Sequence, residues 1–388
     1  MGEAASAKKK SGAIEVRVFG QTDVGQVREH NEDNFLVADL TRKTRSFDPA
    51  EPCTLGRAGA VFGVCDGMGG AAAGEVASQL AVDMIYDRLS EAKAPKGREE
   101  LARRLVKAVQ DAGLRIFGEA RADRSRRGMG TTSTMATLMD DRLFLAQVGD
   151  SRAYLLRDGE LTQITRDQSL VNQLIEAGQL TEEEAETFEH NNIILQALGT
   201  SEVVQVDLTY VDLRAGDSLL ICSDGLSGMV RSEDIGHVLV EVENPIEACA
   251  KLIAAANEAG GHDNVTVVMV KFSGPGLPEI SPDDAPVSYQ KYSFASTEHA
   301  VRGDEASGER SSFRDTAKLP ALARADSRSP AAGGEPGGEA GGLMANAASG
   351  PGEDSMAVPL AGWPPRTVGA IIMAGVTLII VMGFYLLR

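Results

Sequence analysis

The sequence predicts an α+β fold around largely antiparallel strands, followed by a tether and one membrane-spanning helix. Three observations support this prediction. Two-residue turns at Asp140-Asp141 and Asp158-Gly159 join pairs of β-rich segments, as in antiparallel hairpins. Two long segments with helical spacing, 71–90 and 98–122, follow the third strand, which indicates a layered fold. Near Gly274 the composition changes to one rich in Gly, Ala, Ser, Pro and Glu.

Strands and helices alternate up to about residue 272. The predicted strands, which are rich in apolar residues, are 14–22, 34–39, 59–65, 132–139, 142–149, 151–157, 159–164, 204–210, 217–223 and 264–272. The predicted helices are 71–90, 98–122, 168–177, 181–187, 232–241 and 245–259. In the first helix, Val76, Leu80, Met84, Ile85 and Leu89 recur at helical spacing. These segments make up one folded domain.

Four parts are predicted along the chain: a disordered N-terminus (1–13), the folded domain (14–273), a disordered Gly/Ala/Ser/Pro-rich linker (274–366) and a transmembrane helix (367–387). Linker sequences such as AAGGEPGGEAGG bury too little apolar surface to offset the entropy lost on ordering. Residues 367–387 carry no charge and are long enough to cross a bilayer. A buried helix of a soluble domain is the less favoured alternative, because this segment follows the linker.

Charge and cysteine content exclude several classes of protein. The chain has 56 acidic and 38 basic residues, a net charge of -18, which disfavours a general nucleic-acid binder. The four cysteines form no C-x-x-C pair, so no zinc knuckle or thioredoxin-like site is indicated. No secretory signal is visible at the N-terminus, so we expect the folded domain in the cytoplasm.

Acidic residues recur where apolar strands begin or end. Five segments show this pattern: REHNEDNF (Glu32, Asp33), VFGVCDGMGG (Asp66), LFLAQVGDSR (Asp150), SLLICSDGLS (Asp224) and AGGHDNVTVV (Asp263). A single Asp-Gly is usually an ordinary turn, but strand ends cluster in a packed sheet, and converging carboxylates need cations. Oxygen ligands suit Mg²⁺ or Mn²⁺. Gly67 leaves its carbonyl free to approach a metal.

These segments together resemble the metal-dependent serine/threonine protein phosphatases, the type 2C or PPM family, in its bacterial branch. The matching motifs occur in the family's order: TDVGQVREHNED, VFGVCDGMGGAAAGEVAS, GMGTTSTMATL, LAQVGDSRAYLLRDGELTQIT, LICSDGL and GGHDNVTVVMV. The resemblance implies a four-layer α-β-β-α sandwich of two mainly antiparallel sheets, with helices on both outer faces.

The resemblance also implies roles for individual residues. Two Mn²⁺ or Mg²⁺ ions would occupy each active site, with a third, weaker site beside them. The implied metal ligands are Glu32, Asp33, Asp66, Gly67, Asp150, Asp224 and Asp263. Asp66 would bridge the two metals, whose shared hydroxide would attack phosphorus, and Arg28 would bind the substrate phosphate. Asp150 would serve the third site. Met68 stands where some relatives have a histidine, and it cannot donate a proton.

The function predicted from this resemblance is hydrolysis of phosphoserine and phosphothreonine on proteins. The expected partners are phosphorylated proteins and serine/threonine kinases, with the membrane reached through the C-terminal helix, no nucleic acid, and a monomeric catalytic domain. Two alternatives remain open: an inactive pseudophosphatase scaffold, and a phosphatase of a sigma-factor regulatory protein. The segment 165–199 resembles the family's flap, with Asp167-Gln168-Ser169 in place of the usual Asp-His-Ser.

Overall fold

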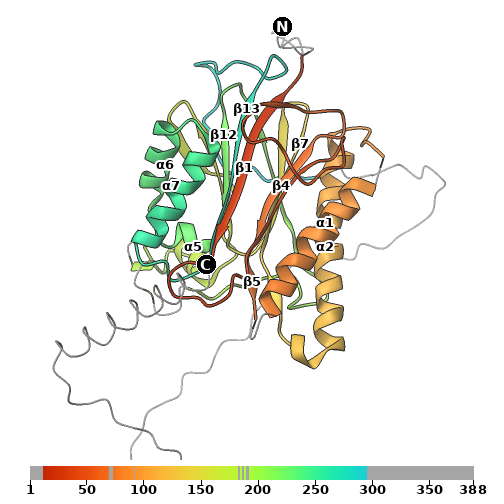
Figure 1. Ribbon diagram of the computed structural model, residues 1–388, viewed down its shortest axis with the longest axis vertical. Coiled ribbons are helices and arrows are strands. Elements are labelled where there is room, and N and C mark those ends of the chain that lie inside the picture. Colours follow the sequence, from red (N-terminus) through yellow and green to blue (C-terminus); the bar gives the residue numbers. More distant parts are fainter. Residues whose placement is uncertain are drawn as a thin grey trace, which may run out of the picture. The chain divides into compact units, whose positions relative to one another are not determined.

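Two antiparallel sheets pack face to face in the described part of the chain (Figure 1). The computed structural model describes residues 12–69, 73–91, 93–181, 184–185, 188 and 192–294. The strand order is β10-β9-β12-β13-β1-β3 in the six-stranded sheet and β11-β8-β7-β4-β2 in the five-stranded sheet.

The six-stranded sheet contains β1 (Glu15–Asp23), β3 (Cys53–Thr54), β9 (Arg152–Arg157), β10 (Glu160–Gln163), β12 (Ser218–Cys222) and β13 (Val265–Ser273). The five-stranded sheet contains β2 (Asn34–Asp39), β4 (Ala60–Cys65), β7 (Ser133–Met139), β8 (Arg142–Val148) and β11 (Asp207–Asp212). A separate ribbon pairs β5 (Gly67–Met68) with β6 (Gly130–Thr131). The helices are α1 (Ala73–Glu91), α2 (Arg98–Ala122), α3 (Leu170–Glu176), α5 (Asp224–Ser227), α6 (Ser232–Glu241) and α7 (Pro245–Glu258), with a 3-10 turn η1 (Arg124–Arg126).

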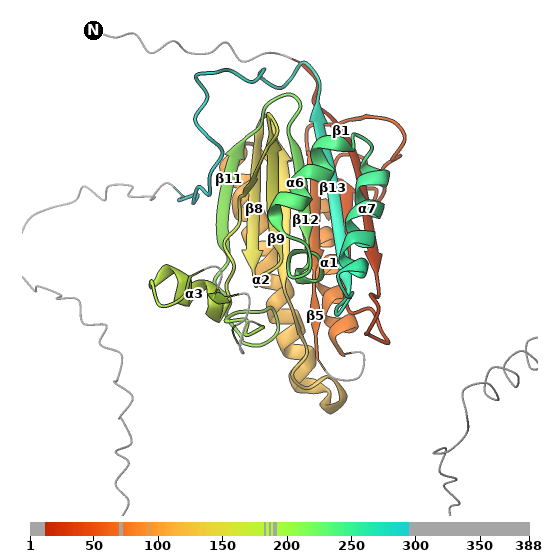
Figure 2. The ribbon, with the colours of Figure 1, turned by 90° about the vertical axis from the view of Figure 1, so that its left-hand side faces the viewer.

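Helices cover the outer face of each sheet. The pair α1 and α2 packs on the five-stranded sheet, and α6 and α7 pack on the six-stranded sheet (Figures 1 and 2). Apolar side chains such as Phe62 and Ile221 fill the space between the sheets. Strand β7 is buried along its whole length, because both faces of its sheet are covered. The predicted α+β class with antiparallel strands is therefore confirmed.

Most predicted elements lie where the sequence placed them. Both hairpin turns are confirmed, and Asp140 and Asp158 adopt positive φ, as tight turns require. The strand expected at 204–210 runs instead from Asp207 to Asp212. The two-residue strands and the one-turn helix α5 were not predicted, because they are too short to show periodicity. The predicted helix 181–187 lies largely outside the described residues.

The chain continues to pack on the domain after β13, along residues 275–294, which we call the C-terminal strap. Leu277 is fully buried in the core between the sheets. The backbone of the strap pairs with the edge strand β11, where Tyr292 N–H donates to the Leu208 carbonyl at 2.8 Å. The Tyr292 ring makes edge-on contacts with Phe144 and Tyr210, at centroid distances of 5.1 and 5.7 Å. The predicted linker start at Gly274 is thus about twenty residues early, since the strap covers this sheet edge.

We expect truncation at the two candidate boundaries to give different stabilities. A chain ending at Ser273 loses the buried Leu277 and the aromatic contacts, which together stabilise the fold by about 3 kcal/mol or more. Its melting temperature should fall by about 10 °C relative to a chain ending at Phe294. Thermal melting of the two truncated proteins checks this. Equal melting temperatures would show that the strap adds nothing to the domain.

The remaining predictions about chain organisation fall on other residues. The N-terminal segment 1–11, the linker from residue 295 and the predicted span 367–387 lie outside the described residues. Within the described ranges, no helix has the length and apolar character needed to cross a membrane.

Candidate metal centre

The strand ends that carry the predicted acidic residues meet at one edge of the sandwich. Asn34 at the start of β2 pairs with Cys65 at the end of β4. Ser133 at the start of β7 pairs with Val148 at the end of β8. In the other sheet, Cys222 at the end of β12 pairs with Val267 near the start of β13. Because Asp33, Asp66, Asp150, Asp224 and Asp263 lie within two residues of these ends, they are brought to the same edge.

Four of these carboxyl groups influence one another directly. Asp66 is close enough to feel the charges of Asp33, Asp224 and Asp150, and it lies within hydrogen-bonding reach of Asp224. Asp33 and Asp150 are buried, with 5% and 9% of their surface exposed. Asp66 and Asp224 are partly exposed. The acidic cluster, defined as Asp33, Asp66, Asp150 and Asp224, therefore opens to solvent through its central members.

Burial and mutual repulsion make these groups hard to ionise. The pKa of Asp33 is raised to about 7, mainly by burial, which outweighs the hydrogen bonds that lower it, with a smaller contribution from the charges of Asp224 and Asp263. Burial also raises the pKa of Asp150 to about 7, together with repulsion from Asp224 and Asp167. The pKa of Asp66 is raised well above its ordinary value by burial and then by its three acidic neighbours. Each would bind a cation more readily than remain an isolated anion.

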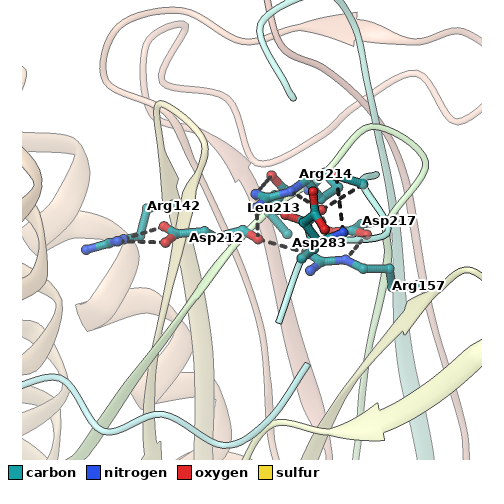
Figure 3. Close-up of polar contacts among 9 residues, drawn as sticks. Arg142, Arg157, Asp212, Leu213, Arg214, Asp217 and Asp283 are labelled. Atoms are coloured by element: carbon teal, nitrogen blue, oxygen red, sulfur yellow. Dashed lines mark hydrogen bonds and ion pairs between the residues drawn. The ribbon is translucent and has the colours of Figure 1, made fainter. Parts of the chain in front are cut away.

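Acidic residues at the opposite edge of the sandwich form ion pairs with arginines (Figure 3). There Asp217 is fully buried and accepts hydrogen bonds from Arg157 Nε and Nη2 at 2.8 and 2.6 Å. Arg142 makes a similar paired contact with Asp212. Arg214 holds Asp284 of the strap and lowers its pKa to about 2. Arginines neutralise this edge, whereas the acidic cluster has no such direct partners among the described residues.

The chemistry of the acidic cluster fits a divalent cation. Asp150 Oδ1 and Asp224 Oδ1 are buried and have no hydrogen-bond partner. Gly67 fits tightly, since a Cβ there would lie 2.3 Å from the Gly74 carbonyl oxygen and 2.4 Å from that of Glu32. Oxygen donors of this kind suit Mg²⁺ and Mn²⁺. Within the described ranges, no three acidic, histidine or cysteine side chains already stand as a closed ligand set, so the carboxylates converge without forming a complete coordination shell.

Arg28 lies at the solvent side of this centre. Its Nη2 donates to Asp263 Oδ2 at 2.7 Å, and about half of its side chain is exposed. Glu32 lies nearby, and its backbone carbonyl accepts from Gly67 N–H at 3.2 Å. The structure therefore brings Arg28 and Glu32 to the same edge as the acidic cluster.

Neutral polar residues that the sequence reading missed hold the acids in place. The Asn264 side chain accepts from Glu32 N–H at 2.8 Å and donates to the Val24 and His30 carbonyls, which fixes the loop before β2. Ser223 Oγ donates to Asp33 Oδ2 at 2.7 Å. Thr132 Oγ1 accepts from Asp66 N–H at 2.9 Å. For Thr132, the sequence offered one indication: it belongs to a run of hydroxyl residues next to a buried strand, and buried hydroxyl groups need hydrogen-bond partners.

Gln168, at the base of the predicted flap, forms hydrogen bonds with the loop that carries Asp150. Its side-chain Oε1 accepts from Gly149 N–H at 2.9 Å, and its own N–H donates to the Gly149 carbonyl at 2.9 Å. Gly149 has φ +103, and a Cβ there would lie 2.7 Å from Thr132 Cγ2. Leu195 N–H donates to the Gln168 carbonyl at 2.7 Å, which joins the two ends of the flap. Helix α3 extends from this base, away from the sheets (Figure 2).

The buried cysteines near the centre are poor nucleophiles. Burial raises the pKa of Cys222 to about 12 and that of Cys65 further still. Both thiols stay protonated near neutral pH, so covalent catalysis by a thiolate is disfavoured here.

Comparison with known sequences identifies relatives of this chain. The family described as "Protein phosphatase 2C" matches residues 50–258. A serine/threonine phosphatase, stp, from Listeria innocua is 37% identical over 251 residues, which cover 65% of this chain and 94% of that protein. The protein phosphatase PhpP of Streptococcus pneumoniae is 36% identical over 260 residues, which cover 65% of this chain and 96% of that protein.

Solved structures of similar fold include the S. agalactiae serine/threonine phosphatase, with a TM-score of 0.59 and 33% identity over 66% of this chain and 99% of that one. The catalytic domain of the serine/threonine protein phosphatase PstP, crystallised with two manganese ions, has a TM-score of 0.56. It is 37% identical and covers 67% of this chain and 99% of its own.

Proposed function

This chain belongs to the protein phosphatase 2C family and is a metal-dependent serine/threonine protein phosphatase, and we propose that the acidic cluster is the centre at which it acts. The observation that supports this most directly is the convergence of four carboxyl groups with raised pKa values at one edge, without arginine partners like those at the opposite edge. The manganese ions in the PstP structure support Mn²⁺ or Mg²⁺ as the cofactor.

Each residue of the centre has a part in holding the cations. Asp66 lies among the other acids and is suited to share its carboxylate between two ions. Asp33, Asp224 and Asp263 would hold one cation, the Gly67 carbonyl and Glu32 would contribute to holding the other, and Asp150 with Asp224 would hold a third, more weakly bound one. Bound divalent cations supply positive charge that lowers the pKa of water and stabilises charge developing on phosphate. Ser223, Thr132 and Asn264 keep the acids and the loop before β2 oriented.

Arg28 is placed to bind the substrate phosphate. Its guanidinium is exposed on one side and contacts Asp263 on the other. The remaining N–H groups of this planar guanidinium can donate two parallel hydrogen bonds to a phosphate, a geometry that a lysine ammonium cannot provide. From this exposed position, Arg28 would hold a substrate phosphate beside the acidic cluster.

An assay of the full chain tests the proposed function. With Mn²⁺ or Mg²⁺, the protein should release phosphate from a phosphothreonine peptide and from p-nitrophenyl phosphate, and excess EDTA should abolish both activities. The pseudophosphatase alternative predicts no turnover with any metal. Turnover that persists in EDTA would overturn the metal-dependent mechanism.

We expect Gln168→Ala to weaken the metal position served by Asp150. Loss of the side-chain hydrogen bond to Gly149, about 1 kcal/mol, should lower Mn²⁺ affinity there about fivefold, while the tight pair stays bound. Calorimetric titration with Mn²⁺ measures this, with Asp150→Ala as the reference. Gln163→Ala is the matched control, because Gln163 contacts Asp167 and not Gly149. Equal effects of the two glutamine variants would contradict the assignment.

We further propose that residues 367–387 anchor the phosphatase to the cell membrane, with the catalytic domain in the cytoplasm opposing serine/threonine kinases. The support is the uncharged run between Arg366 and Arg388. The full chain should sediment with membranes and resist a carbonate wash, whereas a chain ending at Phe294 should not. Release of the full chain by carbonate would refute the anchor and leave the enzyme activity unaffected.

A further inference from the structure

Arginines gather where α2 ends and in the turn after it. Residues 115–127 contain five arginines and two acidic residues, a local net charge of +3 on a chain whose net charge is -18. Both acidic residues in this stretch already form ion pairs with arginines of the same stretch. Glu119 pairs with Arg115 and Arg126, at 2.7 and 3.0 Å, and Asp123 also pairs with Arg126. Both negative charges are therefore neutralised within the stretch.

The other three arginines keep their charge available. Arg121 lies over the Phe117 ring, with 5.6 Å from its guanidinium carbon to the ring centroid. Arg124 and Arg127 are exposed, and neither has an acidic partner within the part of the chain that the structure describes. We call Arg121, Arg124 and Arg127 the arginine loop. An unpaired basic surface is where an acidic partner would be attracted most.

This loop is tied to the catalytic edge by a short stretch of backbone. Thr131 Oγ1 donates to the Asp66 carbonyl at 2.8 Å, and Thr132 N–H donates to the same oxygen at 2.8 Å. Only three residues lie between Arg127 and Thr131, so their Cα atoms are at most about 14 Å apart. The backbone of Arg127 is therefore held near the catalytic edge.

An open apolar hollow adjoins the arginine loop. Its volume is about 440 Å³, and it is lined by Leu114, Phe117, Gly118, Arg121, Ala122 and Glu202. Leu114 is 51% exposed and the neighbouring Val203 is 79% exposed. Glu202 is the one acid in the lining. The hollow offers an apolar contact beside a basic rim.

We propose that the arginine loop and this hollow bind an acidic segment of the protein substrate, about four to six residues from the phosphorylated residue. This proposal rests on the proposed function. An extended peptide advances about 3.3 Å per residue, so four to six residues span roughly 13–20 Å, which is enough to cover the at most about 14 Å between Thr131 and Arg127. Acidic side chains are repelled by most of this strongly negative chain and attracted by the loop. The expected contribution is to substrate binding and association, not to the chemical step.

Charge reversal in the full chain tests this. The double variant Arg124→Glu/Arg127→Glu is assayed on two phosphothreonine peptides, one with Asp and Glu four to six residues from the phosphothreonine and one with Ser and Ala there. We expect kcat/KM on the acidic peptide to fall about tenfold at low salt, mainly through KM. Activity on the neutral peptide and on p-nitrophenyl phosphate should stay unchanged.

The matched control is Arg57→Glu/Lys96→Glu, which changes the net charge equally at an exposed site away from the catalytic edge. An equal loss on the acidic peptide in the control would show a long-range charge effect and overturn the docking site. So would a wild-type enzyme that does not prefer the acidic peptide, or an arginine-loop variant that loses p-nitrophenyl phosphate turnover as well. Absence of wild-type turnover on all three substrates would instead refute the proposed function.

Discussion

Replacing Asp66 by asparagine should lower turnover by about three orders of magnitude while the protein stays folded. Asparagine keeps the size of the side chain and suits the turn after β4, so the backbone contacts to Thr132 can persist. It removes the charge that Asp33, Asp150 and Asp224 surround, and with it the carboxylate best placed to be shared between two cations. The loss of activity therefore comes from loss of metal, not from loss of structure.

Three measurements on the Asp66→Asn variant separate these causes: turnover of p-nitrophenyl phosphate, Mn²⁺ affinity by calorimetry, and melting temperature in EDTA. Mn²⁺ affinity should fall, and the melting temperature in EDTA should stay equal or rise, because one member of a repelling cluster has become neutral. A variant that binds two ions and turns over normally would leave Asp66 as a simple turn residue.

Asp217→Asn at the opposite edge is the informative control. Asp217 is fully buried and held by Arg157, so its neutralisation leaves an arginine without its partner. This should destabilise the fold by about 3–5 kcal/mol and leave Mn²⁺ affinity unchanged in the folded protein. Asp66→Asn should thus weaken metal binding without destabilising the metal-free protein, whereas Asp217→Asn should destabilise the protein without weakening metal binding.

The contrast between the two edges explains what could be predicted from sequence. The sequence predicted five acidic site residues because each is next to a strand that can be recognised from its own apolar residues: Asp33, Asp66, Asp150, Asp224 and Asp263. Strand ends pair by register, so acids at matching ends must converge. The sequence pattern could not show which acidic residues form ion pairs with arginines, because Arg157 and Asp217 come into contact only through the pairing of neighbouring strands.

Neutral positioning residues and the strap were missed for a related reason. Asn264 and Gln168 act through partners 232 and 19 residues away in the chain, and nothing in their immediate sequence reveals those partners. The strap has the composition of a linker. A few apolar residues, Leu277, Tyr292 and Phe294, are nevertheless enough to order it, because an open sheet edge and an aromatic surface are available to receive them.

Without metal, the protein should lose stability as pH rises from 5 to 8. Asp33 and Asp150 have folded-state pKa values of about 7, above the ordinary value of 3.8, so the folded state binds their protons more tightly than the unfolded state does. Their contribution is fully present below about pH 4 and is lost as pH rises through 7. The contributions of the two groups are not additive, because both interact with Asp224.

Thermal melting in EDTA at pH 5, 6, 7 and 8 measures this loss, and we expect the melting temperature to fall by about 10 °C across the range. Paired carboxyls such as Asp284, whose pKa is about 2, stay ionised throughout and add no slope. Saturating Mn²⁺ should abolish the fall, since the cation takes the place of the protons and binds better as they leave. Asp150→Asn should reduce the slope in EDTA, because it removes one of the groups with a raised pKa. A melting temperature in EDTA that is flat or rises from pH 5 to 8 would mean that these carboxyls are already neutralised within the apo fold, and the case for a cation-requiring cluster would fail.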